Sequence, residues 1–362
     1  MNTRSELKSS STERPRILTG DTPTGRLHLG HWVGSLERRV ALQNTHDCFF
    51  ILANVHAFTT RSDKPAEIRS DTMEIVRDYL AAGIDPSLST IFLQSEIPTI
   101  AELTFLFSML LGYGRVMKNP TIKDEIRVKG LGDSYSFGFL LYAVGQTADI
   151  LSFRPVGVPV GEDQVPHIEM TREVARRFNQ LYCGVSDQVD DEKHVANGGV
   201  FPVPRAEVGR VARLVGTDGK NKMSKSLNNA IFLSDTAKQV QKKVNKIYTG
   251  RQSAEDPGDP NNVLFQYHDA FNDDEAQVVE LKERYQAGKV GDGEVKKILG
   301  EKINALLEPM RERRAKYEGN DDLILDILRD GCVRANAVAE ETLSIAKEAM
   351  GLGYFARELQ YE

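Results

Sequence analysis

Two short clusters of basic residues carry the clearest chemical signal in this sequence. The first is a pair of histidines three residues apart, His28 and His31, which would share one face of a helix. Gly25 precedes the pair and Gly30 lies within it, so a ligand could approach the backbone closely. The start of a helix also offers free N–H groups and the positive end of the helix dipole. Together these features predict a site for phosphate groups.

A histidine pair with this spacing has two alternatives to phosphate binding. It could bind a metal, but no third ligand lies nearby in the sequence and the three cysteines lack zinc spacing, so we expect no protein-bound metal. It could also be purely structural. The chain has neither a Walker-type phosphate loop nor a Gly-x-Gly-x-x-Gly motif, so the phosphate interpretation depends on the second cluster.

The second cluster is the segment Lys222-Met223-Ser224-Lys225-Ser226, in a loop rich in glycine, lysine and small polar residues. Lysine suits phosphate binding because its ammonium group is a compact charge on a flexible stem. Two such groups could close on a triphosphate from the side opposite the histidines. An isolated Lys-Ser-Lys would more simply be an exposed basic turn, but the five-residue pattern is far more specific. The glycines before it predict a loop that moves.

Two further groups of polar residues could bind the rest of a nucleotide or a second substrate. Tyr142, Gln146 and Asp149 are spaced by four and three residues on an otherwise apolar helical pattern. A buried acid and amide need partners, so this is either a capped or ion-paired helix face or a pocket that recognises one polar atom of an apolar ligand. The segment 161–164 follows a strand and opens a helix, where acids are common as caps but could also contact a nucleoside.

The elements that must position these groups alternate along the first two hundred residues. Short apolar runs predict buried parallel strands, and amphipathic patterns between them predict helices. This alternation indicates a doubly wound α/β sheet of the Rossmann type, with ligands at the carboxyl ends of the strands. The expected strands are 16–19, 47–53, 90–94 and 156–160, with a further candidate at 208–215 after a long loop over 186–205.

After Asp235 the pattern becomes helical to the end of the chain. The expected helices there are 236–248, 274–287, 293–317, 323–329 and 333–350. We therefore predict a catalytic α/β domain over residues 15–235 and an all-helical region over 236–362. Residues 1–14 are polar and rich in serine and threonine, which predicts a disordered tail.

The composition narrows the class of protein. The chain has 362 residues, of which 40% are hydrophobic and 27% charged, and no apolar run approaches the roughly 20 residues of a membrane span. The N-terminus lacks the apolar core of a secretory signal, and three widely spaced cysteines favour reduced thiols, so we expect a cytoplasmic protein without membrane contact. The net charge of −6 neither supports nor excludes an RNA partner, which would need local basic surface.

In their order along the chain, the segments 28–31 and 222–226 resemble the HIGH and KMSKS signatures of class I aminoacyl-tRNA synthetases. Within that class the sequence is most similar to the tryptophanyl-tRNA synthetases, from about Arg16 to the C-terminus. The other similar segments are 19–20, 23–25, 56–57, 148–150, 158–164, 171–172 and 177–179. This resemblance implies an enzyme that activates L-tryptophan with ATP as the adenylate and transfers it to tRNA(Trp).

The resemblance also implies roles for individual residues. Those that act on the phosphates in catalysis would be His28, His31, Lys222 and Lys225. Those that bind ATP would be Thr22, Gly30, Gly161, Asp163, Gln164, Met223, Ser224 and Ser226. Those around tryptophan would be Leu18, His56, Tyr142, Gln146, Asp149, Val158 and Val160, with Asp149 accepting from the indole N–H. ATP oxygens and water would hold Mg²⁺. The family's members are homodimers whose helical domain reads the anticodon.

Two alternatives to this function remain. Gln146 stands where tryptophanyl enzymes commonly have methionine and tyrosyl enzymes glutamine, and Thr22 replaces a frequent glutamine. A tyrosine–tRNA ligase is therefore one alternative, although Leu18 suits an indole better than a phenol. The other is a synthetase-like regulatory protein that binds nucleotide or RNA. The intact histidines and lysines argue against it, because a pure binder need not keep groups that stabilise a transition state.

Overall fold

A parallel sheet of five strands forms the centre of the molecule, among the residues that the computed structural model describes (14–128, 130–132, 135–211, 214–251, 253 and 255–355). The strands are β1 (Arg16–Asp21), β2 (Asp47–Leu52), β3 (Ser89–Leu93), β4 (Gly157–Val160) and β5 (Arg205–Val208). Their order is β3-β2-β1-β4-β5, so the winding reverses between β1 and β4. Doubly wound sheets bind ligands at this point. The predicted Rossmann-like fold is confirmed.

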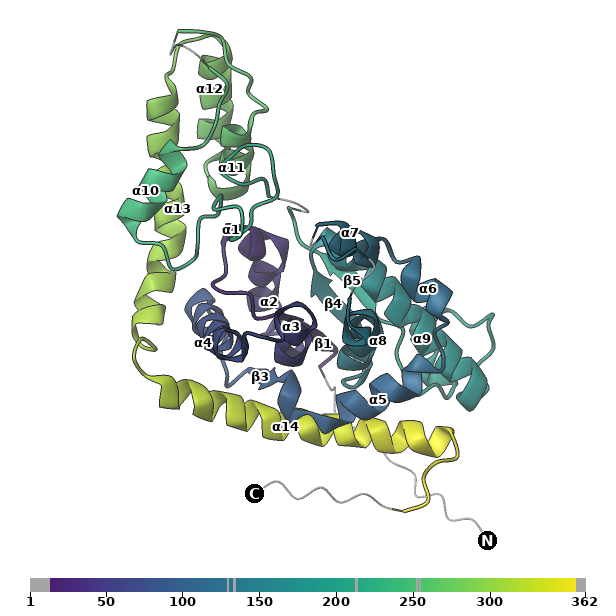
Figure 1. The fold of residues 1–362 in the computed structure, drawn as a ribbon. Coiled ribbons are helices and arrows are strands. Elements are labelled where there is room, and N and C mark those ends of the chain that lie inside the picture. The colour runs from purple at the N-terminus through teal and green to yellow at the C-terminus, as the bar shows by residue number, and fades with distance from the viewer. Residues whose placement is uncertain are drawn as a thin grey trace.

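Helices cover both faces of the sheet (Figure 1). They are α1 (Leu29–His31), a π-helical turn (Trp32–Leu36), α2 (Glu37–Leu42), α3 (Asn54–Arg61), α4 (Pro65–Ala82), α5 (Pro98–Ser108), α6 (Tyr113–Met117), α7 (Pro120–Val128), α8 (Phe137–Leu151) and α9 (Val165–Cys183). Successive strand residues point to opposite faces. Ile17 and Phe50 thus pack in the same apolar cluster as α2 and α4, whereas Leu18 and Phe49 pack with α5, α8 and α9.

The rest of the chain forms a helical lobe and a final long helix. The lobe contains α10 (Ala237–Asn245), α11 (Val263–Phe271), α12 (Glu275–Gln286) and α13 (Asp292–Ala315), and α13 packs against α4 (Figure 1). The last helix, α14 (Asp321–Ala349), leaves the lobe and packs along β3, α4 and α5. The domain boundary expected at residue 235 stays a prediction, and in space α14 lies with the sheet.

The expectation of two helices at 323–329 and 333–350 is wrong, because α14 is continuous through this region. Gly331 lies between the two expected helices, and its lack of a side chain serves packing. A Cβ at this position would collide with the carbonyl oxygen of Ile91 in β3. Next to it, the backbone N–H of Leu93 donates to the Cys332 sulfur at 3.4 Å. The helix thereby covers the edge of the sheet, which would otherwise expose unpaired strand groups.

The strand expected at 208–215 is also wrong in its position, as far as the described residues go, which leave out 212 and 213. The strand β5 spans Arg205–Val208 and pairs with β4, with Val208 opposite Val160. At Gly209 the backbone passes so close to Gly34 of the π-helical turn that a Cβ would collide with the Gly34 carbonyl. The pairing therefore ends where the candidate strand was expected to begin.

Other expectations concern the chain as a whole. The expected tail, residues 1–14, lies outside the described residues except for Arg14. No helix in the described part of the chain has the length and apolar character needed to cross a membrane. Cys48, Cys183 and Cys332 are free thiols.

Candidate active site

The two histidines lie just beyond the carboxyl end of β1, where α1 begins. His28 is the N-cap of α1, and its Nδ1 accepts the Gly30 N–H at 3.2 Å. The His28 backbone N–H in turn donates to Nδ1 of His31 at 3.1 Å, and the two ring centroids are 3.8 Å apart. Because both Nδ1 atoms accept, the neutral rings must carry their hydrogens on Nε2. The motif thus supplies two oriented N–H donors.

Both histidines are neutral at physiological pH. Burial, followed by the electrostatic effects of His31 and of the Lys222 ammonium group, lowers the pKa of His28 to about 2. Burial also lowers the pKa of His31, although the carboxylate of Asp21 opposes this shift. An approaching phosphate would therefore meet hydrogen-bond donors at the histidines and full positive charge only at the lysines.

The lysine loop is tied to the histidine motif through the backbone. The residues after the loop run antiparallel to the motif, with Phe232 opposite His28. Leu29 donates its N–H to the Ile231 carbonyl at 2.9 Å, and Leu233 donates to the Leu27 carbonyl at 3.0 Å. Inside the loop, Met223 is buried. The two predicted signatures, almost two hundred residues apart in sequence, form one site.

The two signature lysines rest on acceptors that phosphate oxygens could replace. Lys222 forms an ion pair of 3.1 Å with Asp163, and Lys225 donates to the Thr24 carbonyl at 3.3 Å. Although burial acts in the opposite direction, Lys222 holds the pKa of Asp163 below its usual range. Gly25 has a φ of 111°, and a Cβ there would collide with the Lys225 ammonium group. Glycine therefore allows this lysine to lie over the turn before His28.

Asp149 of α8 lies in a second part of the site, beside Gln94 at the carboxyl end of β3. It is 5% exposed, and its Oδ1 accepts from Nε2 of Gln94 at 2.8 Å. Gln94 is itself oriented by the backbone N–H of His56, at 3.0 Å. Burial raises the pKa of Asp149 to about 7, and the Gln94 amide offsets only part of that shift. A ligand with an N–H or O–H donor would stabilise the carboxylate.

The other residues expected around an amino acid form the walls of this region. The rings of Tyr142 and His56 meet edge to face, with centroids 4.6 Å apart, and Gln146 donates to Gln164 at 3.2 Å. The apolar side chains are buried in the same cluster as Tyr142; they are Leu18, Val158 and Val160. Thr22 and His56 line a hollow of about 150 Å³.

Three other residues expected at the nucleotide lie in the two loops that carry Asp163 and Lys222. Gly161 is the N-cap of the short turn that carries Asp163 and Gln164. The hydroxyls of Ser224 and Ser226 pair with each other at 2.9 Å inside the loop. Their role toward ATP stays a prediction.

Comparison with known proteins agrees with this geometry. The family model for class I tRNA synthetases (W and Y) matches residues 10–308. The chain belongs to this family. A tryptophan–tRNA ligase of Treponema pallidum (strain Nichols) is 47% identical over 342 residues, which is 93% of this chain and 97% of that protein. One from Lactococcus lactis subsp. lactis (strain IL1403) is 44% identical over 349 residues, 94% and 99% of the two chains.

A solved structure of the family has the same fold. The crystal structure of tryptophanyl-tRNA synthetase from Campylobacter jejuni, complexed with ADP and tryptophan, has a TM-score of 0.77 and 33% sequence identity. The match covers 93% of this chain and all of that one.

Within this synthetase, sequence reasoning missed a buried network behind the histidines. Asp21, the last residue of β1, pairs with Arg39 at 2.6 Å and accepts from the Tyr79 hydroxyl at 2.6 Å. Arg39 is 3% exposed and also donates to Ser35. Burial would raise the pKa of Asp21, but Arg39 outweighs it and lowers the pKa to about 2. The acid at a strand end was the one local signal for this network.

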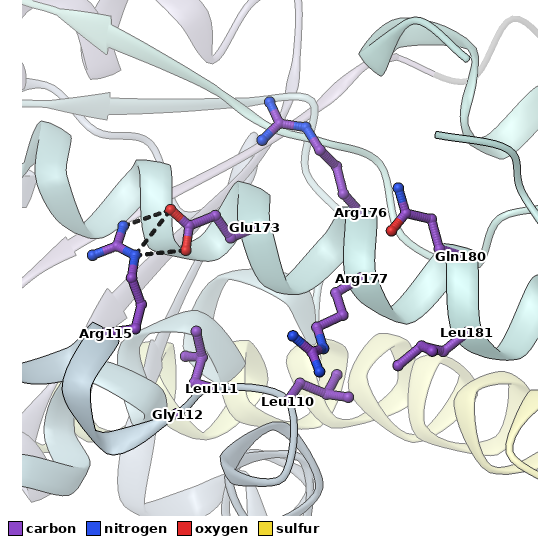
Figure 2. A pocket seen from close by; sticks show the side chains of 9 residues that line it. All are labelled: Leu110, Leu111, Gly112, Arg115, Glu173, Arg176, Arg177, Gln180 and Leu181. Atoms are coloured by element: carbon purple, nitrogen blue, oxygen red, sulfur yellow. Dashed lines mark hydrogen bonds and ion pairs between the residues drawn. The ribbon is translucent and has the colours of Figure 1, made fainter. Parts of the chain in front are cut away.

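A hollow larger than the one beside Thr22 lies elsewhere in the synthetase. It measures about 570 Å³ and is lined by α9 and the segment between α5 and α6, and Figure 2 shows Arg115 and Glu173 paired at one side of it. None of the expected site residues lines it.

Proposed function

We infer that the protein is a tryptophan–tRNA ligase, which activates L-tryptophan with ATP and transfers it to tRNA(Trp). Relatives with this name match it over nearly their full length. The structural observation that carries the inference is the backbone bridge between His28 and Phe232, just after the lysine loop, with the pocket of Asp149 at the same edge of the sheet.

The activation step needs alignment and charge stabilisation more than acid–base chemistry. A tryptophan carboxylate oxygen forms a bond to the α-phosphorus, while the bond from that phosphorus to pyrophosphate breaks. We propose that His28 and His31 donate from Nε2–H to the phosphates. Lys222 and Lys225 would exchange Asp163 and Thr24 for the oxygens of the departing pyrophosphate. The surrounding residues named above for ATP would hold the nucleotide.

Magnesium is proposed as a companion of the nucleotide. Among the described residues, no group of three or more histidine, cysteine or acidic side chains could hold a metal ion. Phosphate oxygens and water are the ligands that Mg²⁺ prefers when protein carboxylates are scarce. The ion would neutralise part of the phosphate charge, and Lys222 and Lys225 would supply the positive charge that comes from the protein.

We propose that the amino-acid pocket prefers indole to phenol. The carboxylate of Asp149 can accept from either ring, so the walls must discriminate between them. Leu18 offers no hydrogen bond to a phenol oxygen and presents an apolar surface to a larger ring. Gln146, next to Gln164, would then serve the substrate ammonium group together with Tyr142.

We further propose a cytoplasmic homodimer that binds tRNA through local basic surface.

The face proposed for the dimer carries large exposed side chains at four-residue spacing on the outer side of α5 and α6. Phe105 is 65% exposed, and Met109 and Tyr113 are exposed as well. Leu181 is exposed beside the hollow of Figure 2. A second copy of the chain would cover this face. Tyr113→Glu should then yield monomers in light scattering, and an unchanged mass would place the contact elsewhere.

The function is tested by amino-acid-dependent exchange of pyrophosphate into ATP across all twenty amino acids. Tryptophan should give the highest exchange rate, and transfer to tRNA(Trp) should follow. A preference for tyrosine would move the protein to the tyrosyl enzymes. Binding of ATP without any exchange would favour a regulatory protein.

The lysine loop is tested by Lys225→Ala, with Lys220→Ala in the same loop as the control. Losing one preorganised electrostatic group should lower the single-turnover activation rate by roughly 10²–10³. The affinity for tryptophan should barely change, because the loop acts on the phosphates. Equal effects of the two variants would contradict the assignment.

A further inference from the structure

A buried carboxylate lies directly behind the histidine signature. Asp78 of α4 is 0% exposed, and its Oδ2 accepts the backbone N–H of Leu27 at 2.7 Å. Its other oxygen, Oδ1, accepts from Arg314 of α13 at 2.6 Å. One carboxylate thus joins the residue before His28 to the helical lobe.

A second buried carboxylate has the same arrangement behind the lysine loop. Asp235 is 2% exposed, and its Oδ2 accepts the backbone N–H of Phe232 at 2.8 Å. The same oxygen pairs with Lys243 of α10 at 2.6 Å, and Arg311 of α13 donates to the Asp235 carbonyl at 2.9 Å. Again one acid joins a cation of the lobe to the segment that follows a signature.

The two acids hold the two strands of the bridge that builds the ATP site. Phe232 is the residue opposite His28, and Leu27 accepts from the next residue, Leu233. The bridge therefore has one acid on each side, and each acid has its cation on the lobe formed by α10–α13 (Figure 1).

We propose that Asp78 and Asp235 are positioning residues that make the placement of the histidine and lysine signatures depend on the seating of the helical lobe. This inference rests on the proposed function, since it concerns the rate of the activation step. Neither acid is placed at the substrates, and each acts through a backbone N–H beside a signature.

The burial of these ion pairs favours coupling between the position of the lobe and that of the signatures, beyond a contribution to stability alone. Breaking a buried ion pair leaves an uncompensated charge, so the acid and its cation must move together. Burial already raises the pKa of Asp78 to about 7 although Arg314 opposes this, so loss of Arg314 would favour the protonated acid. A protonated acid is a weaker acceptor for the Leu27 N–H. The effect would therefore reach His28 without any change at the site itself.

The chain offers matched controls for both cations. Arg77 has the same side-chain exposure as Arg314, 10%, and both pair with Glu74 of α4. Arg77 joins α4 to Asp321 and to the Tyr317 carbonyl, and these partners belong to neither signature. Lys282, which pairs with Asp269 inside the lobe, matches Lys243 in exposure.

The experiment compares Arg314→Met and Lys243→Met with Arg77→Met and Lys282→Met in full-length protein. Single-turnover activation, KM for ATP and tryptophan, and thermal unfolding are measured for each. We call Arg314→Met and Lys243→Met the clamp variants. They should lower the activation rate by about 10- to 100-fold, because small misplacements at a reacting centre slow the reaction by this much. KM for tryptophan should stay unchanged. The acids paired with the control cations are more exposed than Asp78 and Asp235, so the controls should lose less thermal stability, and they should keep the rate within about twofold.

Conservative variants keep the test decisive if the methionine variants fold poorly. Arg314→Lys and Lys243→Arg retain the charge and should restore most of the rate. Equal slowing in the clamp and control variants, or rates in folded clamp variants that match the unmutated protein, would overturn the proposal. If the unmutated protein itself shows no tryptophan-dependent exchange, the proposed function fails instead.

Discussion

Two carboxylates in the catalytic body, the half-buried Asp21 and the buried Asp149, have opposite surroundings. At the end of β1, Asp21 is paired with the Arg39 guanidinium and the Tyr79 hydroxyl, and its pKa falls to about 2. On α8, Asp149 has the neutral amide of Gln94, and burial raises its pKa to about 7. The oxygens of the first acid, Asp21, already accept hydrogen bonds from Arg39 and Tyr79 within the fold. The second retains acceptor capacity that a substrate donor would use, so the same residue type is structural in one region and selective in the other.

The largest effect should come from removing the selective acid. A site built to accept a hydrogen bond rejects an analogue without the donor by about 10⁴–10⁵, because its polar group stays buried and unpaired. Asp149→Ala should therefore lose most of the discrimination against phenylalanine. The ratio of kcat/KM for tryptophan and phenylalanine in pyrophosphate exchange measures this, with unmutated protein as reference. Undiminished rejection of phenylalanine would move recognition of the indole N–H to another residue.

Removing the structural acid should chiefly affect stability. Asp21→Asn leaves the Arg39 guanidinium, 3% exposed, without its counter-charge. Breaking a buried pair in this way costs about 3–5 kcal/mol, which urea unfolding at pH 7 would record. A destabilisation below about 1 kcal/mol would show that water or another acid replaces Asp21.

The contrast between Asp21 and Asp149 also shows which parts of the site could be predicted from the sequence. The histidine and lysine signatures and the Tyr142–Asp149 face are short patterns, and the structure brings each into the site. The partners of Asp21 are Arg39 and Tyr79, 18 and 58 residues away, and no local spacing announces them. Gln94 is the last residue of the strand expected at 90–94, but its bond to Asp149 depends on how β3 and α8 pack.

The main error in the fold lies around Gly331, within the last helix. Gly331 resembles a helix end in sequence, because glycine is a weak helix former. In the structure its missing side chain allows α14 to pass close to β3. A close approach of this kind leaves no periodic signal, so alternating strands and helices were predictable but the course of the last helix was not.

The two acids should also respond oppositely to pH. Asp149 has a folded pKa of about 7, above the ordinary 3.8, so its contribution to stability is full below pH 4 and is lost as pH rises toward 7. Asp149→Asn should therefore gain stability relative to the unmutated protein between pH 4 and 8, by up to roughly 4 kcal/mol for a shift of about three units. Asp21 has a folded pKa of about 2, so its contribution is present above 3.8 and is lost as pH falls through 2.

Urea unfolding of the Asp149→Asn variant and the unmutated protein at several pH values between 4 and 8 measures this difference. The Asp21→Asn variant, compared over the same range, should show a nearly constant deficit. A parallel pair of curves for Asp149→Asn would mean that this acid has an ordinary pKa in the folded protein.

The smallest effect is expected at Gln146, one helical turn from Asp149. Gln146 is half-buried and donates to the Gln164 side chain at 3.2 Å. Gln146→Met removes the neutral hydrogen bond to Gln164, worth about 0.5–1.5 kcal/mol, and one of the two contacts proposed for the substrate ammonium group. Because Tyr142 remains, kcat/KM for tryptophan should fall by no more than about tenfold. Rejection of tyrosine should persist, because Leu18 and the pocket walls are unchanged. Efficiencies for both amino acids, measured in parallel with Asp149→Ala, test this. If Gln146→Met instead collapsed tryptophan activation to the level of the Asp149 variant, a neutral amide at the edge of the pocket would carry the selectivity assigned to the buried carboxylate.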